Sequence, residues 1–185
     1  MQIDSFEVTI SNISSLLVNR FHEAAQAEAT SGVHSRARDP QTPEEDAESR
    51  LYKLPDGQTY FPAENLRQSC ITAAGRHKIG RRTASTDAAA ALSIEPDAMP
   101  LIGEWHTDSR AVVIPATKGR LLRHRPMFDK WTISFNMLIV SSMFDVNLAR
   151  RVLDDAGLYV GIGDFRPQKK GPFGRFQVDN WTKVS

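Results

Sequence analysis

The chain of 185 residues has little cysteine and no long apolar run, and each absence excludes a class of protein. Its single cysteine, Cys70, excludes an intrachain disulfide, and we interpret it as a small core residue because it falls in a helical pattern. No segment reaches the roughly 18 consecutive apolar residues that a membrane-spanning helix needs. The N-terminus, MQIDSFEVTI, lacks the basic and apolar regions of a signal peptide. We therefore expect a cytoplasmic protein that contacts no membrane.

The formal net charge is only +1, so the chain as a whole does not attract polyanions. The charges are nevertheless separated along the sequence. Residues 39–48 contain acids without any Lys or Arg, whereas residues 76–82, 118–125 and 166–175 are almost purely basic. This distribution predicts a basic surface and a detached acidic loop.

Two stretches alternate between apolar and polar residues, as half-buried strands do. They are residues 2–10 and residues 130–140. A helix is predicted over residues 63–74, and a second helix begins with Ser142 as its cap and ends at Gly157. With short strands between and a strand at the end, this order predicts an α+β fold with a ferredoxin-like βαββαβ sheet and helices on one face. We expect a single domain over the whole chain.

Residues 30–50 contain almost nothing that could pack in a core. Ser, Gly, Pro and acids dominate, and the Asp39-Pro40 and Thr42-Pro43 pairs disfavour regular structure. A structureless segment of this length within a small domain is either disordered or functional. We interpret it as a long mobile loop, either a disordered insertion or an arm that reaches a neighbouring subunit or a ligand.

The segment Leu158–Val178 combines glycines with cations and lies between a predicted helix and the final strand. Glycine reaches positive φ at little cost, and successive free N–H groups in such a loop form a concavity suited to anions. We therefore interpret the segment as a contact for a phosphate backbone. A plain β-hairpin with a solvated basic tip is the alternative.

The other two basic segments are candidates for the same role. In residues 76–82 the cations follow a helix C-terminus. The helix dipole favours positive charge there, which explains the presence of some of these cations. In residues 118–125 they alternate with leucines. The candidate nucleic-acid-binding residues of the three segments are Arg76, Lys78, Arg81, Arg82, Lys118, Arg120, Arg123, Arg125, Gly161, Gly163, Arg166, Lys169, Lys170, Gly171, Gly174 and Arg175.

The ending, with Gly161 and Gly163 before a basic loop and the run Gly171 to Phe176 after it, resembles the RAMP superfamily, the RNA-binding backbone proteins of CRISPR effector complexes. Over nearly its full length the chain is similar to uncharacterised bacteriophage proteins of RAMP-like appearance. The further motifs that carry this similarity are Arg20-Phe21, Arg38-Asp39-Pro40, Leu51-Tyr52, Pro62-Ala63-Glu64 and Arg125-Pro126.

The resemblance implies subunits that stack head to tail on single-stranded RNA or DNA and hold it by its phosphates. The arm would cross to the neighbouring subunit, and the basic segments would line the groove. The partners would be nucleic acid and further copies or other subunits, in the cytoplasm of a bacterial host cell. Phe165, Phe173 and Phe176 are available for base stacking.

Catalytic patterns are weak in this sequence. The histidines lack metal-binding spacing, and the Gly171–Gly174 run is too short for a Walker loop. His106 between acids and Asp164 in the glycine loop are more typical of solvated surface and of turn capping. We expect no enzyme, no metal and no cofactor. The remaining alternative is a phage structural or assembly protein whose basic loop binds a protein; it would scatter the basic segments and use the apolar end of residues 130–140 as an interface.

Overall fold

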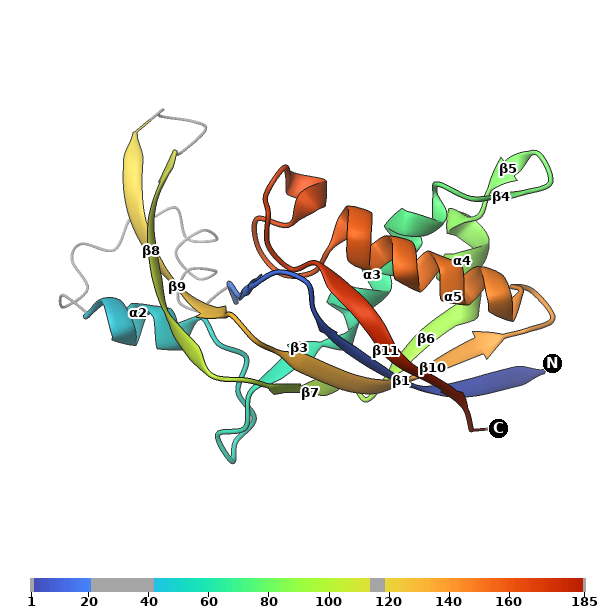
Figure 1. Cartoon of the computed structure of the whole chain (residues 1–185), viewed down its shortest axis with the longest axis horizontal. Helices are drawn as coiled ribbons and strands as arrows, with labels where there is room; N and C mark the ends of the chain where they lie inside the picture. The colour runs from blue at the N-terminus through green and yellow to red at the C-terminus, as the bar shows by residue number, and fades with distance from the viewer. Residues whose placement is uncertain (1, 21–41, 114–118, 185) are drawn as a thin grey trace, which may run out of the picture.

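The computed structural model describes residues 2–20, 42–113 and 119–184 (Figure 1). Its helices are α2 (Pro43–Ser49), α3 (Ala63–Ala74), α4 (Ser85–Ala91) and α5 (Val146–Asp155), with a π-helical turn (Ala156–Val160) and a 3₁₀ turn (Pro167–Lys169). Its strands are β1 (Ile3–Asn12), β2 (Leu16–Leu17), β3 (Tyr60–Pro62), β4 (Lys78–Ile79), β5 (Arg82–Thr83), β6 (Leu92–Glu95), β7 (Ala98–Ile102), β8 (Trp105–Val113), β9 (Arg120–Phe128), β10 (Thr132–Val140) and β11 (Phe176–Lys183).

The main sheet is antiparallel, and its strands run in the order β11, β1, β10, β7 and β3. Strand β6 also pairs with β10, beyond the end of β7, so that Ile94 lies opposite Met137. Strand β1 is central, and its Val8 lies between Phe135 of β10 and Trp181 of β11. The fold is therefore α+β, as the sequence predicts.

Helices cover one face of this sheet. Figure 1 shows α3, α4 and α5 together on one side of it. Phe6, Val8 and Ile10 of β1 are buried, whereas Glu7 between them is exposed, which confirms the predicted alternation. Cys70 of α3 is fully buried, and burial raises the pKa of its thiol to about 12, so it packs as a small apolar residue. No helix of the described residues is long and apolar enough to cross a membrane.

The prediction that residues 30–50 form one long loop is wrong for its second half. Residues 43–49 form α2, and residues 30–41 lie outside the described part of the chain. Thr42 caps this helix through a capping box, because its side chain accepts from the Glu45 amide while the Glu45 side chain accepts from the Thr42 amide. Pro43 occupies the first turn, where proline favours a helix rather than blocking it.

The second long helix begins and ends at other residues than predicted. Its N-cap is Asp145, whose carboxylate accepts a hydrogen bond of 2.8 Å from the Leu148 amide, not Ser142. The helix does not end at Gly157 but continues as the π-helical turn to Val160. Gly157 instead allows the backbone at Phe176 to pack closely against this turn, since a Cβ there would lie 2.2 Å from the Phe176 carbonyl oxygen.

A second sheet of β2, β9 and β8 contains a long hairpin. Strand β8 runs from Trp105 to Val113 and pairs with β9 along its whole length. Figure 1 shows the β8–β9 hairpin rising at one end of the molecule, with α2 beside it, and the short β4–β5 hairpin at the opposite end. Only the base of the β8–β9 hairpin reaches the core, through Phe128 and Trp105.

The corrected cap of α5 predicts a measurable difference between two substitutions. Asp145→Ala should lower the free energy of unfolding by about 1 kcal/mol, because the Leu148 amide loses its acceptor. Ser142→Ala should change it by less than about 0.5 kcal/mol, as surface substitutions do. Urea unfolding followed by circular dichroism measures both, and equal effects would contradict the assignment of the cap.

Candidate nucleic-acid interface

The β8–β9 hairpin divides its side chains between two faces. Asp108 and Arg110 of β8 lie directly opposite Arg125 and Arg123 of β9. Successive strand residues alternate, so these four residues share one face. Arg120 falls on the other face by the same alternation. The basic run predicted over residues 118–125 is therefore split by the strand, and Lys118 lies outside the described residues.

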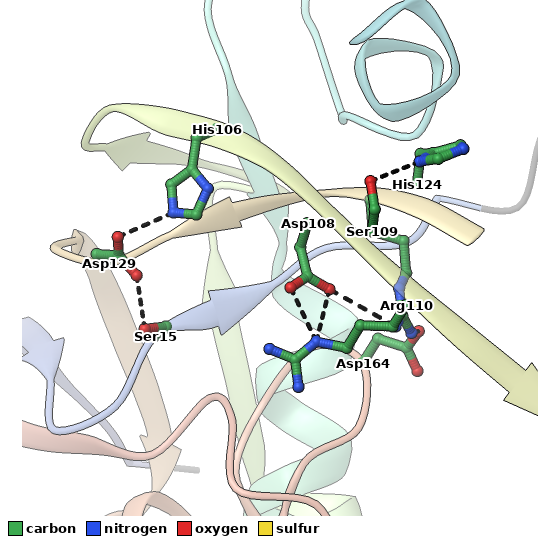
Figure 2. A network of polar contacts seen from close by, with 9 residues as sticks. Ser15, His106, Asp108, Ser109, Arg110, His124, Asp129 and Asp164 are labelled. Carbon is green, nitrogen blue, oxygen red and sulfur yellow. Dashed lines mark hydrogen bonds and ion pairs between the residues drawn. The ribbon is translucent and has the colours of Figure 1, made fainter. Parts of the chain in front are cut away.

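On the other face, Ser109 lies opposite His124, and Figure 2 shows the 2.7 Å hydrogen bond between the Ser109 hydroxyl and the His124 Nδ1. Among the described residues no carboxylate bonds the second His124 nitrogen. A serine–histidine pair needs such a group to orient the imidazole. The pair is therefore a polar cross-strand contact.

A buried ion pair joins the hairpin to the glycine-rich loop. Arg125 is 5% exposed, and its Nη1 donates a hydrogen bond of 2.8 Å to Oδ2 of Asp164. Asn19 donates to the same oxygen at 3.2 Å, and the Arg125 Nη2 lies 3.9 Å from the Asp108 carboxylate. Asp108 in turn accepts two bonds, of 2.8 and 2.9 Å, from the Arg110 Nε, and Figure 2 shows these residues together. Asp164 thus holds the loop against the hairpin.

The glycine-rich loop, residues 161–175, is not the open nest of free amides that we expected. The Ile162 amide donates to Gly174, the Gly174 amide to Ser15 and the Asp164 amide to Leu17, at 2.9, 2.8 and 2.7 Å. The amide of Phe165 donates to the side chain of Asp164. Because these donors are occupied, the loop offers no backbone cradle of free amides at these positions.

The glycines of the loop permit this close packing. Gly163 and Gly174 have φ of +77° and +73°, a region that L side chains rarely adopt. A Cβ on Gly163 would lie 2.6 Å from the Leu17 carbonyl oxygen, and one on Gly174 would lie 1.8 Å from that of Ile162. The structure thus gives these two glycines a packing role, and their predicted contact with nucleic acid stays a prediction.

A groove of about 480 Å³ lies between the hairpin and the loop. Arg110, Arg123 and Arg125 line it from the hairpin, and Asp164 and Phe165 from the loop. The Phe165 side chain is 40% exposed, and among the described residues Arg123 has no acidic partner. The charge of Arg110 is offset by Asp108 and that of Arg125 by Asp164, so the groove keeps one uncompensated positive charge beside an exposed aromatic ring.

Arg110 is the functional candidate that the sequence did not reveal. Its guanidinium lies over the Phe173 ring, 4.7 Å from the centroid, so hairpin and loop meet a second time here. The apolar run that follows Arg110 indicates a strand, and a single arginine beside such a run gives no sign of a binding site. The register of the hairpin is what brings it opposite Arg123, so that two like charges face each other across the strands.

The other predicted site residues lie elsewhere. Figure 1 shows the β4–β5 hairpin, which carries Lys78, Arg81 and Arg82, at the far end of the molecule from the groove. Arg82 pairs with Asp87 at 2.9 Å, and Arg76 lies over the Tyr159 ring at 4.1 Å. Of the three basic segments, only residues 118–125 contribute cations to the groove, through Arg123 and Arg125.

The remaining cations of the glycine-rich loop point away from the groove lining. Lys169, Lys170 and Arg175 are exposed, and none of them lines the groove. Arg166 is half-buried because its guanidinium bonds the Gly163 carbonyl at 3.0 Å and the Gln168 side chain. Gly161 and Gly171 are buried and serve the packing of the loop.

His106 does not pair with the acids next to it in sequence. Its Nε2 lies 2.9 Å from Oδ2 of Asp129, whose Oδ1 accepts from the Ser15 hydroxyl at 2.8 Å, as Figure 2 shows. The carboxylate stands between serine and histidine, so the histidine cannot take the serine proton. Within the described residues there is also no group of three potential metal ligands.

Comparison with known proteins finds a likeness in structure alone. No family model and no curated protein matches the chain. A chain in the cryo-EM structure of the Type III-B Cmr-beta bound to cognate target RNA is similar over 100% of this chain, with a TM-score of 0.54 and 11% sequence identity. The present chain covers 61% of that chain. At this identity the likeness shows a similar fold and no more.

The packing of the loop predicts different costs for two glycine substitutions. Gly174→Ala should lower the free energy of unfolding by more than about 2 kcal/mol, because positive φ strain adds to the clash with the Ile162 carbonyl. Gly80→Ala, at φ +62° with nothing within 4 Å, should cost only about 1 kcal/mol. Thermal and urea unfolding of both variants measure the difference, and equal costs would contradict the close packing.

The buried ion pair gives a third prediction. Asp164→Ala should lower the free energy of unfolding by about 2–3 kcal/mol, because it leaves Arg125 buried with only the distant Asp108 as its counter-ion. The variant Asp164→Ala/Arg125→Met removes both charges and should recover part of this loss. A double-mutant cycle in urea measures the coupling, and additive effects would show that the pair is not coupled.

Proposed function

We propose that this chain binds single-stranded nucleic acid by its phosphate backbone, in the groove between the β8–β9 hairpin and the glycine-rich loop. The observation that carries the proposal is the meeting of Arg110 and Arg123 with the exposed ring of Phe165 in one groove. Arginine guanidinium groups bind phosphate oxygens in a bidentate manner, and aromatic rings stack on unpaired bases. We propose no catalysis, no metal and no cofactor for this role.

The order of the strands supports a ferredoxin-like core. The last strand, β11, pairs with the first, β1; β1 pairs with β10, and β10 with β6. Helix α3 precedes β6 and α5 precedes β11, as in a βαββαβ arrangement. This supports the resemblance to RAMP proteins, and the similar chain belongs to a complex bound to target RNA. RNA is therefore the first strand to test.

Assembly belongs to the same proposal. A groove of about 480 Å³ holds only a few nucleotides, so one copy covers a short stretch of a strand. We propose that further copies or other subunits continue the binding surface along it. From the resemblance to bacteriophage proteins we propose a role in phage replication, recombination or a CRISPR-like complex in a bacterial host.

The alternative, a phage assembly protein, loses part of its expected interface. Met137 and Ile139, at the apolar end of β10, are fully buried between β1 and β6. On the other face of this end Leu138 and Val140 are half-buried, and Val140 lies opposite the exposed Ile3, so a small apolar surface remains for a partner. The residue 76–82 segment is separated from the β8–β9 hairpin, and this observation favours the alternative.

Fluorescence anisotropy with labelled single-stranded RNA and DNA over a salt series tests the proposal. The variant Arg110→Ala/Arg123→Ala should weaken binding at least about tenfold and reduce the slope of log affinity against log salt by about 1.4, the value for two lost phosphate contacts. Lys78→Ala/Arg81→Ala removes the same charge at the opposite end and should change neither quantity.

Three outcomes would contradict the proposal. Equal effects of the two variants would show that charge, not the groove, determines binding. An effect confined to Lys78→Ala/Arg81→Ala would place the interface at the β4–β5 hairpin. No binding to either strand at low salt would exclude nucleic acid as a ligand, and a protein partner would then be sought for the basic surface.

A further inference from the structure

A second, smaller pocket adjoins the groove. Asn19 and Asp164 line both cavities, so the two lie next to each other on either side of this pair of residues. The smaller pocket has a volume of about 170 Å³, and its other walls include Tyr52, Asn65 and Arg166. A ligand bound along the groove passes directly beside its mouth.

The volume of the pocket limits what can enter. A cavity of about 150 Å³ accommodates one benzene ring. At about 170 Å³ the pocket therefore holds one six-membered ring with its substituents, but not a fused two-ring system with the same clearance. Among nucleobases this size selects a pyrimidine over a purine.

The pocket and the groove differ in their charged groups. Asp164 contributes a carboxylate to the pocket, and it accepts from Arg125, Asn19 and the Phe165 amide, so it offsets the charge of Arg125. The Arg166 guanidinium is held by the Gly163 carbonyl and the Gln168 side chain. The Asp164 carboxylate repels a phosphate at the shared wall, whereas Arg123 on the groove side has no acidic partner among the described residues. The phosphate is therefore assigned to Arg123.

The walls offer both stacking and hydrogen bonding. Tyr52 belongs to an aromatic cluster, with ring centroids 5.5 Å from Tyr60 and 6.5 Å from Phe61. Burial raises the pKa of Tyr52, and its phenol can donate a hydrogen bond. Asn65, exposed in the first turn of α3, hydrogen-bonds the Tyr52 side chain, and the rest of its amide faces a ligand in the pocket. Pyrimidine edges present donors and acceptors to such an amide.

We propose that the pocket between Tyr52, Asn65 and Asp164 receives one pyrimidine base of the bound strand while its phosphate lies on Arg123 in the groove. The inference rests on the proposed function and adds base selectivity to it. Backbone contacts alone would make the chain indifferent to sequence. The pocket makes it prefer strands with a pyrimidine at one position in each binding site.

Anisotropy with labelled oligo-U, oligo-C, oligo-A and abasic strands of equal length, at one salt concentration, tests this inference. The two pyrimidine strands should bind roughly tenfold more tightly than oligo-A and the abasic strand, given the usual contribution of one stacked base. Asn65→Ala should remove this preference without changing abasic binding. Gln68→Ala, an exposed amide one turn along α3 that lies outside the pocket, should leave the preference intact.

A crosslinking experiment locates the base independently of any variant. Oligo-U containing 4-thiouridine is irradiated with the wild-type protein, and the modified peptides are identified by mass spectrometry. Crosslinks to residues 51–66 would support the pocket, whereas crosslinks confined to the β8–β9 hairpin would overturn it.

The outcomes separate the two proposals. Equal binding of all four strands, a purine preference, or a pyrimidine preference that Asn65→Ala leaves unchanged would overturn the pocket while the groove still binds nucleic acid. Binding of none of the strands would overturn the proposed function, and the pocket with it.

Discussion

The candidate interface depends on one buried ion pair, between Arg125 of the hairpin and Asp164 of the glycine-rich loop. A guanidinium at 5% exposure loses its hydration, and only a close carboxylate in good geometry compensates for that loss. The pair therefore fixes the distance between hairpin and loop, and with it the width of the groove. Its partners extend the constraint, because Asn19 connects Asp164 to Arg50 of the α2 end, and Asp108 connects Arg125 to Arg110. The Asp164 carboxylate thus connects the glycine-rich loop, the β8–β9 hairpin and the end of α2, which are distant in sequence.

The glycine-rich loop holds Asp164 in place for the ion pair with Arg125, and its backbone does not form a cradle for an anion. Its amides bond to Ser15 and Leu17, next to the end of β1, so the loop is anchored to the main sheet. The glycines at 163 and 174 remove the side chains that would hold the backbones apart. What the loop presents to a ligand is consequently set by its side chains, chiefly Phe165 and the carboxylate of Asp164. The same anchoring gives the groove and the smaller pocket a common wall.

Local patterns in the sequence were sufficient for some of the regular elements but not for α2 or β9. Strands β1 and β10 and helix α3 follow from alternation and helical spacing, because burial on one face is a property of neighbouring residues. The cap of α5 was misplaced because Ser142 and Asp145 are both good caps, and only the geometry decides between them. The site was predictable in part: the loop and the residue 118–125 segment do meet. Pairings such as Arg125 with Asp164 or Arg110 with Arg123 depend on register and on packing between remote segments, which no local pattern contains.

The facing arginines of the hairpin, Arg110 and Arg123, have an energetic consequence of their own. Like charges directly across two strands repel each other, and this repulsion is part of the free energy of the empty hairpin. Asp108 already reduces this repulsion by accepting two hydrogen bonds from Arg110. Under the proposed function, a phosphate beside Arg123 would reduce it further. Binding and hairpin stability are then thermodynamically linked: whatever anion occupies the groove also stiffens the strands that form it.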